Sequence, residues 1–162
     1  MQHNLFPSQL ALTLLVSLIW ICASQGVSKT PVIYFPLDER FATRGIFLNL
    51  ANITSSDHEI FTPPLDIVCS YRQSADLPAL YAWFEKTLDD QCRTLKSHYS
   101  CIIILSSELF LYGGLISSRI SNTSTATIID RVNYLNDIKQ SYGNNIIIYL
   151  SNVVMRIPAY NS

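Results

Sequence analysis

The stretch Pro31-Val32-Ile33-Tyr34-Phe35-Pro36 is a short apolar run that leads directly into the polar cluster Leu37-Asp38-Glu39-Arg40. Polar clusters also follow the apolar runs at 101–105 and 146–150. Uninterrupted apolar runs of this length are typical of strands buried on both faces of a parallel sheet. In parallel α/β proteins, ligands bind at the carboxyl ends of the strands. The sequence therefore predicts where a site lies before it indicates what the site does.

Helical patterns separate these strands. A short helix is predicted over 43–52, where apolar residues recur at helical spacing. A longer helix begins at Asp76, whose side chain can cap the first turn, and it carries one apolar face. A third helix opens at Thr123 or Ser124 and ends at Gly143, a residue type that tolerates a positive φ.

The resulting order is β-α-β-α-β-α-β, with strands at 31–36, 58–61, 101–105 and 146–150. Alternation of strands and helices predicts an α/β fold whose parallel strands are joined by right-handed crossovers. Four strands leave two architectures open, a partial (β/α)-barrel and a doubly wound domain. Because no helical pattern follows the last strand, we expect residues 25–162 to be the N-terminal part of an α/β domain truncated at its C-terminus.

The N-terminus has the pattern of a targeting segment. Residues 10–22 are almost wholly apolar, and small residues for cleavage follow at 22–24. This run is shorter than the ~20 residues that a membrane-spanning helix needs. We therefore predict a signal peptide at 1–24, the alternative being an uncleaved anchor. The mature chain is expected to be secreted or in the lumen of the secretory pathway, without a membrane segment.

The sequons and the cysteines are further indicators of whether the chain enters the secretory pathway. Asn52 and Asn122 each begin an acceptor pattern for N-glycosylation, which predicts that both lie at the surface. Cys69, Cys92 and Cys101 follow the signal peptide, an odd number for an oxidising compartment. One disulfide with a free thiol, a partner cysteine outside the chain, and three unpaired buried cysteines all stay open.

Composition limits the partners of the chain. Of 162 residues, 49% are hydrophobic and 14% charged, with 11 basic and 12 acidic residues, which fits a buried core. No basic stripe stands out, so nucleic acid is not an expected partner. The sequence has no C-x-x-C, no metal-ligand spacing, no G-x-G-x-x-G and no Walker loop, and we predict neither a metal nor a cofactor.

The polar clusters also resemble family signatures. Residues 35–40 resemble a Pro-Leu-Asp-Asp-Arg motif, with Glu39 in place of the second Asp. Residues 111–119 resemble Tyr-Gly-Gly-Leu-(Ile/Val)-(Ala/Ser)-Ser-Arg, and residues 154–158 resemble a third block. In this order they are similar to the N-terminal part of the uncharacterised family domain of unknown function 4127. The resemblance implies that the chain is a fragment of a longer protein, and it assigns no catalytic residue.

Three carboxylates are the candidate catalytic groups. Asp38 and Glu39 follow the first strand, and Glu108 follows the third. Carboxylates from two strand ends are what a glycosidase requires for acid/base or nucleophilic chemistry. The alternatives are a capping and salt-bridge cluster for Asp38, Glu39 and Arg40, and an exposed loop residue for Glu108.

A second set of residues is expected to hold a substrate, namely Arg40, Tyr112, Gly113, Gly114, Arg119 and Arg156. Arginine can clamp an anionic or hydroxylated ligand. Paired glycines indicate a sharp turn or a close approach of the backbone, and a tight turn without ligand contact is the alternative. The leading hypothesis is a secreted hydrolase acting on a polar substrate such as a carbohydrate, a small molecule or a glycan. The other two are a non-catalytic ligand-binding module and an inactive truncated fragment.

Overall fold

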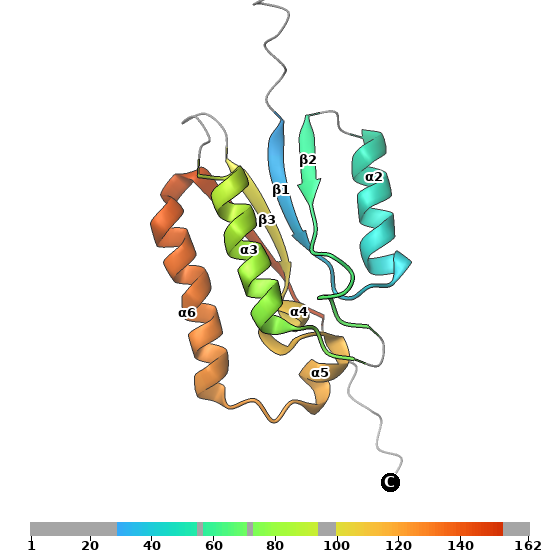
Figure 1. Ribbon diagram of the computed structural model, residues 1–162, viewed down its shortest axis with the longest axis vertical. Coiled ribbons are helices and arrows are strands. Elements are labelled where there is room, and N and C mark those ends of the chain that lie inside the picture. The colour runs from blue at the N-terminus through green and yellow to red at the C-terminus, as the bar shows by residue number, and fades with distance from the viewer. Residues whose placement is uncertain (1–28, 55–56, 71–72, 94–99, 154–162) are drawn as a thin grey trace, which may run out of the picture.

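The computed structural model describes residues 29–54, 57–70, 73–93 and 100–153 (Figure 1). The predicted signal peptide at 1–24, Arg156 and the 154–158 motif lie outside these residues. The described part contains an open, four-stranded parallel sheet in the order β2-β1-β3-β4. The strands are β1 (Thr30–Phe35), β2 (His58–Phe61), β3 (Cys101–Ser106) and β4 (Ile146–Ser151).

Helices connect the strands. A π-helical turn, η1 (Phe41–Gly45), runs into α2 (Ile46–Thr54), and α3 (Leu77–Gln91) joins β2 to β3. The connection from β3 to β4 contains α4 (Ser107–Tyr112), α5 (Leu115–Ile120), α6 (Thr125–Tyr142) and the short η2 (Gly143–Asn145). Among the described residues, no helix is both long and apolar enough to cross a membrane.

The predicted α/β fold with parallel strands is confirmed. A partial barrel would place its strands in the order of the chain, whereas here β1 lies between β2 and β3 in an open sheet, which excludes the barrel alternative. Asp76 caps α3 as predicted, because its carboxylate accepts a hydrogen bond from the Ala79 N–H at 3.1 Å. Ser124 caps α6 by accepting from the Thr127 N–H at 3.1 Å, and Gly143 follows α6 with φ of 56°. Helices α4 and α5 carry no recognisable sequence pattern, because they are too short to show a helical period.

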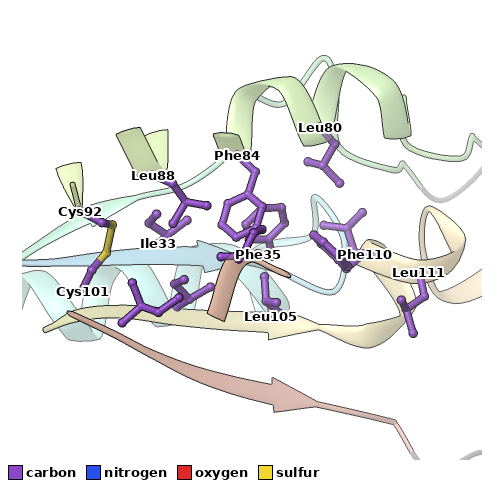
Figure 2. Packing of buried hydrophobic residues seen from close by; sticks show 14 of the residues in the cluster. Ile33, Phe35, Leu80, Phe84, Leu88, Cys92, Cys101, Leu105, Phe110 and Leu111 are labelled. Carbon is purple, nitrogen blue, oxygen red and sulfur yellow. A yellow bond between two sulfur atoms is a disulfide. The ribbon is translucent and has the colours of Figure 1, made fainter. Parts of the chain in front are cut away.

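The core lies between the sheet and the α3 layer. Figure 1 shows α3 and α6 on one face of the sheet and α2 on the other. Phe35 of β1 packs edge-on against Phe84 of α3 and Phe110 of α4, with ring centroids 5.0 and 5.8 Å apart (Figure 2). Each large apolar side chain that is fully buried contributes about 1.5–3 kcal/mol. Because this cluster joins β1, α3 and α4, it fixes the strand ends from which the polar residues emerge.

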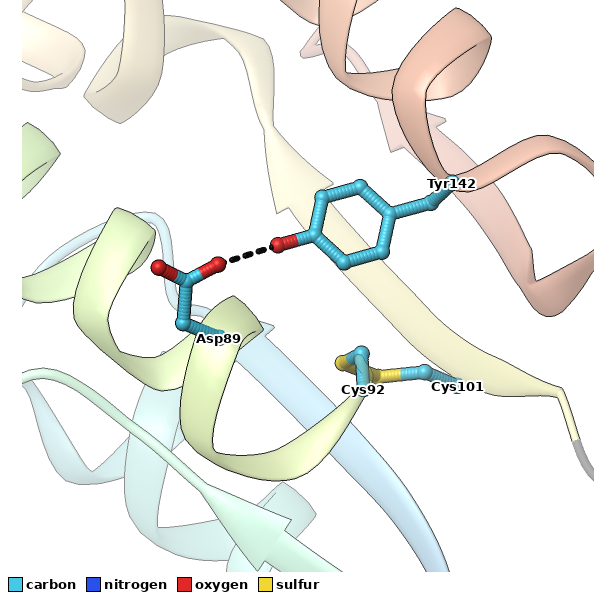
Figure 3. The surroundings of a disulfide bond; sticks show 4 residues. All are labelled: Asp89, Cys92, Cys101 and Tyr142. Atoms are coloured by element: carbon cyan, nitrogen blue, oxygen red, sulfur yellow. Dashed lines mark hydrogen bonds between the residues drawn. A yellow bond between two sulfur atoms is a disulfide. The ribbon is translucent and has the colours of Figure 1, made fainter. Parts of the chain in front are cut away.

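A disulfide closes the other end of this layer. Cys92 at the end of α3 is bonded to Cys101 at the start of β3, and Cys69 is a free, buried thiol. Nearby, the Tyr142 hydroxyl of α6 donates a hydrogen bond to the Asp89 carboxylate of α3 at 2.7 Å (Figure 3). Of the alternatives left open by the sequence, the structure has one disulfide and one free thiol.

Strand order creates a switch point between β1 and β3. From β1 the chain crosses to β2 on one side through α2, and it later returns to place β3 on the other side of β1. The segments that follow β1 and β3 therefore depart toward opposite faces of the sheet. A crevice forms where neighbouring connections diverge in this way, and ligands of open α/β sheets bind there.

Candidate functional site

A cavity of about 450 Å³ lies at this switch point. Asp38 and Arg40, which follow β1, form one part of its lining. The turn and helix that follow α4 contribute Gly114, Ser117 and Arg119. The structure thus brings together four of the residues predicted from sequence, Asp38, Arg40, Gly114 and Arg119, although Asp38 and Arg119 are 81 positions apart along the chain.

Asp38 is the buried anion of the cavity, with 6% of its surface exposed. Its Oδ1 accepts hydrogen bonds from the Arg40 N–H at 3.0 Å and from the Thr43 hydroxyl at 2.5 Å. Its Oδ2 accepts from Arg40 Nε at 2.8 Å and pairs with Nη2 at 2.6 Å. Burial raises the pKa of this carboxyl, but the hydrogen bonds from Arg40 and Thr43 outweigh burial and hold the pKa below its ordinary value of 3.8. Asp38 is therefore ionised at neutral pH.

The double glycine forms a turn that packs against protein. Gly113 and Gly114 have φ of 81° and 133°, a region that favours glycine. A Cβ added to Gly114 would lie 2.7 Å from the Cys69 sulfur, so only glycine fits there. The Gly113 carbonyl accepts a hydrogen bond from the Ala75 N–H at 2.9 Å. The sequence indicated a sharp turn or a close approach at the glycine pair; the structure has both, and the approaching neighbour is the segment that precedes α3.

The connection between β2 and α3 contributes cavity residues that were not predicted from the sequence. Cys69, Ser70, Gln73 and Ser74 all line the cavity. The hydroxyls of Ser74 and Ser117 are hydrogen-bonded to each other, which ties the segment to α5. The segment has no helical or strand period, so the only signal available in the sequence was its concentration of polar residues between two prolines and Asp76.

Cys69 is a packing residue at the cavity wall. Its sulfur donates to the Leu37 carbonyl at 3.4 Å, and the side chain is 3% exposed. Burial and the neighbouring charge of Asp38 raise the pKa of the thiol to about 11. Because the thiolate is the reactive form, Cys69 is a weak nucleophile at neutral pH.

Glu108 lies apart from the cavity lining. It is 5% exposed, in the first turn of α4, and not in an exposed loop. Its Oε2 accepts hydrogen bonds from the hydroxyls of Ser106 at 3.0 Å and Ser107 at 3.2 Å. Its Oε1 accepts from the Val153 N–H at 2.7 Å. These bonds join the carboxyl ends of β3 and β4.

The other predicted residues lie as follows. Glu39 is exposed and Tyr112 is partly buried, and neither lines the cavity. Asn52, in the last turn of α2, and Asn122, between α5 and α6, are both exposed. No cluster of three or more His, Cys, Asp or Glu that could hold a metal ion occurs in the part of the chain that the structure describes.

The cavity can form hydrogen bonds of both polarities. Asp38 accepts, Arg40 and Arg119 donate, and the serine hydroxyls and the Gln73 amide do both. Leu115 and Ile116 add apolar surface beside these groups. Such a lining suits a small molecule that carries several hydroxyls on a carbon framework.

Comparison with known proteins gives a single kind of match. No curated protein and no solved structure matches the chain. The family model described as "Protein of unknown function (DUF4127)" matches residues 32–162, which confirms the resemblance found from the three motifs. The chain therefore belongs to the DUF4127 family of proteins of unknown function.

Proposed function

We propose that the switch-point cavity binds a small polyhydroxylated molecule of the carbohydrate class, and that the protein acts as a ligand-binding module. The observation that carries this proposal is the mixed polar lining of a cavity of about 450 Å³, within the usual size of small-molecule sites. Sugars present hydroxyls that both donate and accept, together with an apolar C–H surface. The serines, Gln73 and the Leu115 wall match those features.

Charge at the cavity favours an acidic sugar over a neutral one. The ion pairs found among the described residues are Arg40–Asp38 and Arg93–Asp89, and they leave Arg119 without an acidic partner there. The charge of Arg40 is balanced by Asp38, whereas that of Arg119 is available to a ligand carboxylate. We therefore propose that a sugar acid binds more tightly than the matching neutral sugar.

Binding is favoured over hydrolysis by the placement of the carboxylates. A glycosidase of the two-carboxylate kind needs both groups at the scissile bond. Asp38 lines the cavity, but Glu108 accepts its hydrogen bonds from Ser106, Ser107 and Val153 outside the lining. Hydrolysis stays a prediction from the sequence, and it would need a second acid that the described residues of the cavity do not supply.

Calorimetric titration of the purified chain with glucose and with glucuronate tests the proposal. We expect saturable binding of both, with glucuronate tighter by about tenfold, which corresponds to about 1.4 kcal/mol for one added ionic hydrogen bond. Arg119→Gln should bring the two affinities together. Asp38→Asn should weaken both, whereas Asp90→Asn, a change to an exposed carboxylate on α3 outside the cavity, should weaken neither. If neither glucose nor glucuronate binds, the proposal is refuted.

We also propose that the protein works in the secretory pathway. Support comes from the Cys92–Cys101 disulfide, since disulfides persist in oxidising compartments. The exposure of Asn52 and Asn122 leaves both sequons accessible to glycosylation. Treatment of the expressed protein with an N-glycosidase should reduce its mass by the mass of two glycans. A variant in which either asparagine is replaced by glutamine should carry a single glycan.

A further inference from the structure

A groove lies between α3 and α6, the two helices that run side by side on one face of the sheet (Figure 1). It consists of two adjoining hollows of about 260 and 270 Å³, and Glu85 and Tyr134 line both of them. None of the described residues that line this α3–α6 groove lines the switch-point cavity. The groove is therefore a second candidate site, independent of the proposed sugar site.

Two tyrosine rings line the first hollow, and both are anchored to the core. The ring centroids of Tyr81 and Tyr134 are 5.7 Å apart. The Tyr81 hydroxyl donates a hydrogen bond to the carbonyl of the buried Phe110 at 2.7 Å. The Tyr134 ring stacks on the Phe110 ring, with centroids 6.3 Å apart. Because these contacts hold both rings in place, a partner that binds against them loses little side-chain entropy.

The lining of the groove has an excess of negative charge. It contains four carboxylates and two guanidinium groups, a net charge of −2, from Glu85, Asp89, Asp130, Asp137, Arg93 and Arg131. Both guanidinium groups already have acceptors, since Arg93 pairs with Asp89 at 2.6 Å and Arg131 donates to the Leu111 carbonyl. Among the described residues, Glu85, Asp130 and Asp137 are in no ion pair. Their charge is available to a cationic partner.

The second hollow shows which chemistry such a lining holds. The Arg93 guanidinium carbon lies 5.7 Å from the centroid of the Tyr142 ring. The Asp89 carboxylate pairs with this guanidinium and also accepts a hydrogen bond from the Tyr142 hydroxyl at 2.7 Å (Figure 3). A guanidinium of the chain itself is thus held by an aromatic ring and a carboxylate together. The first hollow has the same combination, with two tyrosine rings beside Glu85 and Asp130.

We propose that the α3–α6 groove is a docking surface for a partner protein with a basic segment. An arginine of that segment lies against the rings of Tyr81 and Tyr134 and pairs with Glu85 and Asp130. Arginine suits the first hollow better than lysine, because a planar guanidinium stacks on an aromatic ring and donates two hydrogen bonds to one carboxylate. Tyrosine and arginine are also enriched among the residues that supply most of the binding energy of interfaces.

Other occupants fit the groove less well. Each hollow is smaller than the 300–1,000 Å³ typical of sites that enclose a small molecule, and suits a side chain. A second copy of the chain would have to supply the basic segment, but its 11 basic residues form no basic stripe. Within the described ranges, no three His, Cys, Asp or Glu are grouped to hold a metal ion, so the groove carboxylates do not form a metal site.

Calorimetric titration of the purified chain with end-blocked hexa-arginine, hexalysine and hexaglutamate tests this proposal. We expect saturable binding of hexa-arginine and no binding of hexaglutamate. Hexalysine should bind about fivefold more weakly than hexa-arginine, because ammonium groups lose the stacking on the tyrosine rings. Tyr134→Phe keeps the ring and should keep this preference, whereas Tyr134→Leu should remove it.

A pair of double variants separates the groove from general charge attraction. Glu85→Gln/Asp130→Asn should weaken hexa-arginine binding by about tenfold, because it removes two exposed ion pairs. The matched control is Glu59→Gln/Asp66→Asn, which removes two exposed carboxylates that lie outside the groove lining. It should weaken binding by less than about twofold. All four residues are exposed, so both variants should keep the Tm of the wild type.

Several results would overturn the proposal. These are no binding of hexa-arginine, equal weakening by the two double variants, and a preference for arginine that Tyr134→Leu leaves intact. Equal affinity for hexa-arginine and for N-acetylarginine amide would overturn it in favour of a small organic cation. Dimerisation of the chain that Glu85→Gln/Asp130→Asn abolishes would overturn it in favour of a second copy.

Discussion

Asp38 and Glu108 are two buried carboxylates that follow the neighbouring strands β1 and β3, yet they are held in different ways. Asp38 is bonded within its own connection, to Arg40 and Thr43. Glu108 accepts from two hydroxyls beside it and from the N–H of Val153, 45 residues further on. The difference teaches that position after a strand does not define a role. A carboxylate whose hydrogen-bond donors are all nearby in the sequence can line a cavity. A carboxylate that accepts a hydrogen bond from a distant segment stabilises the fold by joining the two segments.

The largest effect is expected from Glu108→Ala. The change removes the acceptor of three hydrogen bonds in a buried place, and each unsatisfied donor costs about 1–3 kcal/mol before the hydroxyls reorient. We expect a loss of about 3 kcal/mol in the free energy of unfolding, measured by urea denaturation. Glu108→Gln, which keeps one oxygen acceptor, should lose less. A loss below about 0.5 kcal/mol, the level typical of surface sites, would remove Glu108 from its structural role.

Asp38→Asn should have the next largest effect, about 2 kcal/mol at pH 7, because it removes the charge of a buried carboxylate from its ion pair with the half-exposed Arg40 and weakens the Thr43 bond. Since the pKa of Asp38 is lowered in the folded protein, its charge stabilises the fold fully above the ordinary value of 3.8. That stabilisation is lost as the pH falls through the folded pKa. The stability difference between wild type and variant should therefore shrink below about pH 4. A difference that grows in acid would show that the pKa is raised instead.

The smallest effect in this comparison concerns Thr43, whose hydroxyl donates to Asp38. Thr43→Val keeps the shape and removes one hydrogen bond, at a cost of about 1 kcal/mol. Because the bond favours the charged carboxylate, its loss should raise the pKa of Asp38, which NMR titration of the carboxyl carbon would detect. Thr43→Ser retains the hydroxyl and should leave the pKa unchanged. Equal pKa values in the Val and Ser variants would assign the lowered pKa to Arg40 alone.

Part of the candidate site could be predicted because its residues have local signals. Asp38 and Arg40 follow directly on a recognisable strand, and Gly114 belongs to a glycine pair that requires positive φ. Ser70 and Gln73 carried no such signal, since they lie in an irregular connection that reaches the cavity only because β2 and β1 are neighbours. The burial of Glu108 was equally hidden, because one of its three hydrogen-bond donors, the Val153 N–H, is remote in the sequence.

The sequence by itself determined the alternation of strands and helices, the parallel sheet, the cap at Asp76, a second cap at Thr123 or Ser124, and the polar groups at strand ends. These follow from hydrophobic period and local hydrogen bonding, which act over a few residues. Only the tertiary structure decided the order β2-β1-β3-β4, the cavity between β1 and β3, and which carboxylate faces it. Those outcomes depend on contacts between segments tens of residues apart, whose packing no local pattern encodes.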